Sequence, residues 1–67
     1  MNESIARQLD REAELEMVAL SRGQADRCSV LITIAAVEAA WQQLGQDFWP
    51  EIGYWNRTRS LLERGVS

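Results

Sequence analysis

An all-α fold is predicted for this sequence, with two to three short helices arranged as a helical hairpin plus a C-terminal helix and assembled as a dimeric helical bundle. Apolar residues recur at spacings of three and four, the period of an amphipathic helix. Gly23, Gly45 and Gly65 each follow such a run, where helices often end in a left-handed residue. The 67 residues form one small domain, 1–67. A chain this short buries only about 60% of its unfolded surface, so we expect a second copy to add stability.

The first helix is expected over residues 3–22, and Asn2 or Ser4 can cap its start. Its apolar side chains form one stripe, with the charged side chains mostly off it: Ile5, Ala6, Leu9, Ala13, Met17 and Leu20. Carboxylates share faces of this helix as the i, i+4 pairs Asp10–Glu14 and Glu12–Glu16. Because arginines are interleaved with them, we interpret these carboxylates as a solvated outer face.

The second helix is expected over residues 26–44. Its core is a seam of a/d type at spacings of four and three, formed by Val30, Ile34, Val37, Trp41 and Leu44. This seam exceeds what one short neighbouring helix covers, which is a second reason to expect a homodimer. Residues 29–34 are β-branched enough to form a strand instead. Helix is the favoured interpretation, because the rest of the chain offers no partner strand apart from a dimer mate.

The third helix is expected over residues 48–64, with Pro50 in its first turn and Asp47 as a plausible cap. Gly53 in its interior costs up to about 1 kcal/mol relative to Ala, so the helix can break there. Its apolar residues lie on one side: Phe48, Ile52, Trp55, Leu62 and Val66.

The composition argues against an enzyme and against a bound cofactor or metal. The chain has no His, a single Cys and a formal charge of −3, so it lacks the commonest general base and any multi-Cys metal site. We interpret Cys28 as a small packed hydrophobe. The longest apolar stretch, 30–40, is too short to span a bilayer. An acidic chain with one thiol fits the reducing cytoplasm, and the exclusive use of Arg as the basic residue hints at a bacterial or phage genome.

Aromatic residues are concentrated at the start of the third helix. Four of the five fall within eight positions: Phe48, Trp49, Tyr54 and Trp55. Adjacent helical residues point about 100° apart, so Phe48 and Trp49 cannot both enter one small core. Trp, Tyr and Arg are the commonest anchors of protein interfaces. The predicted partner-binding residues are therefore Phe48, Trp49, Tyr54, Arg57 and Arg59.

The function expected from these features is that of a small non-enzymatic protein-binding regulator. It would be an inhibitor, anti-activator, adaptor or chaperone that docks on a larger protein. The alternative is a small nucleic-acid-associated regulator that uses the C-terminal Arg and aromatic face. The negative net charge makes nucleic acid the less favoured partner, because phosphate neutralisation needs many cations.

Overall fold

The computed structural model describes residues 2–65, and the first of its helices, α1, spans Glu3–Ser21. The helix begins where Asn2 Oδ1 accepts a hydrogen bond from the backbone N–H of Ile5 at 3.0 Å. It ends in a Schellman motif, in which the Gln24 N–H donates to the Ala19 carbonyl at 2.8 Å. Gly23 has a φ of 72° in this motif, a conformation that glycine adopts without the steric penalty of a β-carbon.

Helix α2 spans Arg27–Leu44. Asp26 is its N-cap, with Oδ2 accepting a hydrogen bond from the Ser29 backbone N–H at 3.2 Å. Residues 29–34 are helical throughout, and residues 2–65 contain no strand. The β-branched side chains of this stretch are therefore accommodated in a helix, where tertiary packing overrides their local preference. Gly45, with a φ of 109°, closes the helix.

A short 3₁₀ turn, η1 (Gln46–Phe48), leads into helix α3, Trp49–Glu63. The expectation that Asp47 caps α3 is wrong, because Asp47 lies within η1 and Phe48 occupies the N-cap position without a side-chain cap. Pro50 stands in the first turn of α3, where its missing N–H costs no helical hydrogen bond. The helix runs unbroken through Gly53. Val66 lies outside the described residues.

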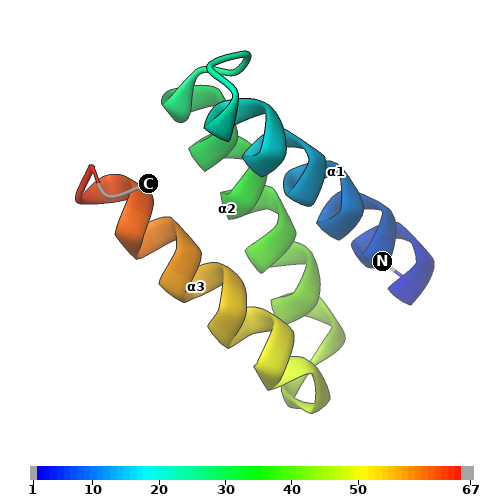
Figure 1. Ribbon diagram of the computed structural model, residues 1–67. Coiled ribbons are helices and arrows are strands. Elements are labelled where there is room, and N and C mark those ends of the chain that lie inside the picture. Colours follow the sequence, from blue (N-terminus) through cyan, green and yellow to red (C-terminus); the bar gives the residue numbers. More distant parts are fainter. Residues whose placement is uncertain (1, 66–67) are drawn as a thin grey trace.

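Helix α2 is the centre of the fold, and α1 and α3 pack against it from two sides in antiparallel directions (Figure 1). No Cα atom of α1 lies within 8 Å of a Cα atom of α3. The two outer helices are therefore joined through α2 and through side chains alone.

The core is built on the inward side of α2, where Val30, Ile34, Val37 and Trp41 are fully buried and Leu44 is half-buried. The other buried apolar residues are Ala6, Ala13, Ala40, Trp55 and Leu62. Side chains of α1 and α3 from the same chain cover this seam. The inference from an uncovered seam to a dimer therefore does not hold, because two neighbouring helices, rather than one, pack on α2.

Candidate functional site

The two adjacent aromatic residues at the start of α3 differ in burial. The Phe48 ring packs on Trp41, with ring centroids 5.0 Å apart, and joins the edge of the core. Trp49 is 71% exposed. The structure therefore turns Phe48 inward and Trp49 outward, which is the split that their 100° separation on a helix requires.

Tyr54 lies at the side of α3 that faces α1. Its ring meets the Trp55 ring edge to face at 4.9 Å, and much of the side chain remains exposed. Burial of the hydroxyl raises the pKa of Tyr54, and the neighbouring Glu14 carboxylate raises it further. Tyr54 is therefore a neutral hydrogen-bonding group at the rim of the exposed surface.

The two predicted arginines also separate. Arg59 Nε donates to Glu38 Oε1 at 2.6 Å, and the Glu38 side chain is almost fully buried. Arg57 is exposed, and its guanidinium lies back over Gly53 on the outer side of α3. Arg59 is thus committed to a contact within the chain, whereas Arg57 is available to a partner.

Three of the five predicted residues consequently remain exposed along α3. Trp49, Tyr54 and Arg57 are exposed, and so is Leu61, which sequence analysis did not single out; Tyr54 lies at the edge towards α1. We call these four residues the outer α3 face. Phe48 and Arg59 do not belong to it, because they turn towards α2. The signal for Leu61 was its spacing of four from Arg57 and seven from Tyr54.

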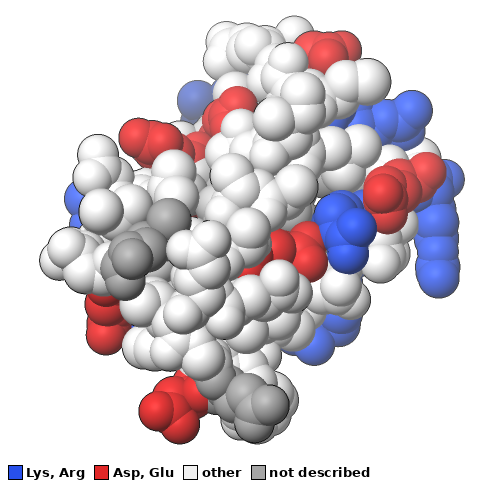
Figure 2. Space-filling model, turned by 180° about the vertical axis from the view of Figure 1, so that it is seen from behind, with Lys and Arg blue, Asp and Glu red and all other residues white. Residues whose placement is uncertain are grey.

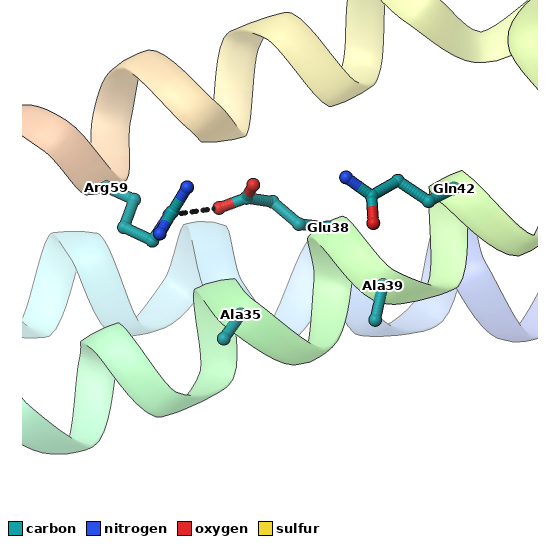
Figure 3. A pocket seen from close by; sticks show the side chains of 5 residues that line it. All are labelled: Ala35, Glu38, Ala39, Gln42 and Arg59. Atoms are coloured by element: carbon teal, nitrogen blue, oxygen red, sulfur yellow. Dashed lines mark hydrogen bonds and ion pairs between the residues drawn. The ribbon is translucent and has the colours of Figure 1, made fainter.

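The Glu38–Arg59 contact forms one wall of an open hollow between α2 and α3, with a volume of about 260 Å³. Ala35 and Ala39 leave the space free, and Gln42 lies one turn of α2 beyond Glu38 (Figure 3). The hollow offers paired charges and an amide but no nucleophile. It can hold a side chain of another molecule, and its residues supply no acid–base chemistry beyond the ion pair.

A polar centre that sequence analysis missed joins all three helices. Asp10 Oδ2 accepts hydrogen bonds from Trp41 Nε1 at 3.0 Å and from Trp55 Nε1 at 2.7 Å. Asp10 was assigned to a solvated face, and this assignment is wrong. The available signal was its position: Asp10 takes the place of an apolar residue in the 6–10–13–17 spacing of the stripe on α1.

Three further features concern metal ligands, the single cysteine and membrane-spanning helices. Within residues 2–65, no group of three or more His, Cys, Asp or Glu side chains could hold a metal ion. Cys28 is exposed, so its interpretation as a packed hydrophobe is wrong. It lies in the first turn of α2, on the side that α1 and α3 leave open. None of the helices in this part of the chain has the length and apolar character needed to cross a membrane.

Comparison of the chain with protein-family models, with curated proteins and with solved structures finds no match. The arrangement of its own side chains is therefore the basis for the functional proposal below.

Proposed function

We propose that the chain is a small non-enzymatic protein-binding regulator that docks on a larger protein through the outer α3 face. The observation that carries this proposal is the exposure of Trp49, whose side chain is 71% exposed. Leaving an indole in water is unfavourable, and a Trp that becomes buried in a partner's pocket is a typical binding hot spot. An inhibitor, anti-activator, adaptor or chaperone would use such a surface.

The surroundings of Trp49 support its role as an anchor. Pro50 fixes the backbone directly after it, which lowers the conformational entropy lost when the indole is immobilised against a partner. Tyr54 and Leu61 add apolar area on the same helix, and Arg57 adds a charge that can orient the partner. An aromatic anchor with apolar neighbours and an Arg has the composition of a protein interface.

The proposal extends to the assembly and location of the chain. We take the regulator to act as a homodimer, because a domain of 67 residues gains stability from a second copy. We place it in the cytoplasm of a bacterium or phage-infected cell, where the exposed thiol of Cys28 stays reduced.

A binding titration with the partner tests the proposal. The partner is first captured from native host lysate with the wild-type chain and identified by mass spectrometry. Trp49→Ala should then weaken binding roughly thirty- to thousandfold, the loss typical of an interface Trp. The same variant should change the free energy of unfolding by well under about 1 kcal/mol, because the indole contributes little to the core.

Leu15→Ala is the matched control, since Leu15 is 64% exposed on α1, away from the outer α3 face. It should leave the affinity unchanged. Equal affinities of the wild type and Trp49→Ala would overturn the proposal. A micromolar affinity for DNA that falls steeply with salt would favour the nucleic-acid alternative instead. The engagement of Arg59 by Glu38 argues against that alternative, because it removes one of the few cations of α3.

A further inference from the structure

Helix α2 carries few charged residues on any side, although its neighbours cover only one side. After Arg27, its only charged residue is Glu38, and Glu38 is paired with Arg59. A mostly uncharged, apolar exposed side on a helix favours a further packing contact there. Seen from behind, the molecule shows a broad uncharged area that is interrupted near its middle by adjacent acidic and basic side chains (Figure 2).

The uncovered side of α2 carries a second seam. Cys28, Ile32, Ala35, Ala39 and Gln42 follow the same spacings of four, three, four and three as the buried seam. Ile32 is 73% exposed, and the other members are exposed as well. We call these five residues the outer α2 seam. Two a/d seams on opposite sides are characteristic of a helix in the middle of a bundle.

We infer that a second copy of this chain covers the outer α2 seam, with the two α2 helices packed side by side in parallel. The small side chains of Ala35 and Ala39 allow the helix axes to approach closely, to about 8 Å. The hollow beside Glu38 and Arg59 lies along the same side of α2 and leaves room for side chains of the second copy. This inference deepens the homodimer part of the proposed function and does not depend on the larger partner.

Charge favours a second copy in parallel orientation. Helix α1 with its C-cap Arg22 carries five acidic residues and three Arg, a net charge of −2, whereas α3 with its C-cap Arg64 carries three Arg and two Glu, a net charge of +1. These helices lie along the two edges of the covered side of α2. A twofold axis along α2 places each acidic α1 on the side of the partner's basic α3. An antiparallel pairing would place α1 beside α1, where the like charges repel.

The small size of the available surface favours a weak dimer. The Cα atoms span 33 × 20 × 14 Å, so the face that contains α2 can bury several hundred Å² per copy. This lies at the lower end of specific interfaces, below about 800 Å² per partner. We therefore expect a dimer that forms at micromolar concentration and dissociates on dilution.

Sedimentation equilibrium tests the inference. The wild-type mass should rise from 7.6 kDa towards twice that value across the micromolar range, and the melting temperature should rise with concentration. A mass of one chain throughout would overturn the inference. Trp49→Ala should dimerise like the wild type, so failure of the dimer and failure of partner docking are separate outcomes.

Position 32 provides the sharpest variants, because a parallel twofold pairing brings Ile32 close to its own symmetry mate. Ile32→Glu and Ile32→Arg should each remain helical and sediment as monomers, whereas an equal mixture of the two should dimerise again. Ala39→Glu serves as a second disruptive variant. Leu15→Glu, at a site of similar exposure on α1, should dimerise like the wild type. Full dimerisation of both Ile32→Glu and Ala39→Glu would overturn the inference.

Cys28 reports on the orientation. In the parallel dimer the two Cys28 residues approach each other across the axis, within reach of a disulfide under an added oxidant. An antiparallel pairing about the middle of the seam would separate them by roughly 20 Å, from the helical rise of 1.5 Å per residue. We expect rapid cross-linking of the wild type and none of Ile32→Glu at the same concentration. A dimer that does not cross-link through Cys28 would overturn the parallel arrangement.

Discussion

At the scale of single residues, Asp10 links all three helices through hydrogen bonds. One carboxylate oxygen on α1 accepts hydrogen bonds from an indole of α2 and an indole of α3. Arg7 lies over the Trp41 ring at 5.3 Å, one turn before Asp10, and adds a cation–π contact. Both indoles are fully buried. Their N–H groups therefore depend on this single acceptor, since a buried donor without a partner is costly.

Replacing Asp10 with Ala should destabilise the fold strongly. Each of the two indole N–H groups left without an acceptor costs about 1–3 kcal/mol, so the free energy of unfolding should fall by about 2–6 kcal/mol. Chemical denaturation followed by tryptophan fluorescence measures this loss. Glu12→Ala is the control, because Glu12 is an exposed carboxylate on the same helix, and should change stability by less than about 0.5 kcal/mol. Equal denaturation midpoints for the two variants would contradict the bridging role of Asp10.

Tyr54 provides a prediction about pH. Burial first and the Glu14 carboxylate second raise its pKa above the ordinary value of 10.0. The folded state therefore holds the phenolic proton more tightly than the unfolded state. This contribution to stability is fully present below pH 10 and is lost as the pH rises through the raised pKa.

The chain has a single tyrosine, so the ultraviolet absorbance of tyrosinate titrates Tyr54 directly. Glu14→Gln should lower the pKa of Tyr54, because the nearby negative charge is removed. Glu12→Gln should leave it unchanged. A pKa that does not respond to Glu14→Gln would show that burial alone accounts for the shift.

At the scale of helices, several ends could be predicted from the sequence and the contacts between helices could not. Asn2 caps α1, and Gly23 and Gly45 close α1 and α2 with positive φ values, whereas the predicted cap Asp47 lies in η1. These signals are local and act through the backbone of a few neighbouring residues. The contact of Asp10 with two indoles depends instead on which sides of α2 and α3 meet α1. The spacing of apolar residues within one helix does not contain that information.

Helix α2 also shows what a seam in a sequence can and cannot predict. The spacing from Val30 to Leu44 predicts a buried side, and four of its five residues are fully buried. It does not predict which chain covers that side, because α1 and α3 of one chain and a helix of a second chain would bury the same residues. The outer α2 seam was less visible in the sequence, since alanines and a Gln give a weak apolar signal.

The two sides of α2 should respond differently to the same substitution. Val37→Asp places a charge in the fully buried seam without a partner, which costs several kcal/mol against a total stability of about 5 kcal/mol, and should abolish folding. Ile32→Asp places the same charge on the exposed side and should leave the helical circular dichroism intact. A cooperative thermal transition for Val37→Asp would show that α2 is packed differently from the structure described here.

At the scale of the whole molecule, the fold depends on α2, because α2 is the helix that both α1 and α3 contact. Both α1 and α3 pack on α2, and no Cα atoms of α1 and α3 approach within 8 Å of each other. We therefore expect either outer helix to open without unfolding the other, at the cost of the hydrogen bond between Asp10 and Trp55 that joins them, whereas opening of α2 removes the core of both. The stability of the backbone should accordingly be unequal across the three helices.

Native-state hydrogen exchange followed by NMR tests this inequality. The amides of α2 around Ile34 and Val37 should exchange most slowly, with a free energy of opening close to that of global unfolding. The amides of α1 and α3 should exchange faster through partial openings. Asp10→Asn should widen the difference, because Asn keeps an acceptor oxygen but loses the charge that strengthens both hydrogen bonds from the indoles. Equal protection of all three helices in the wild type would show that the chain opens only as one unit, and the central role of α2 would then be confined to its packing.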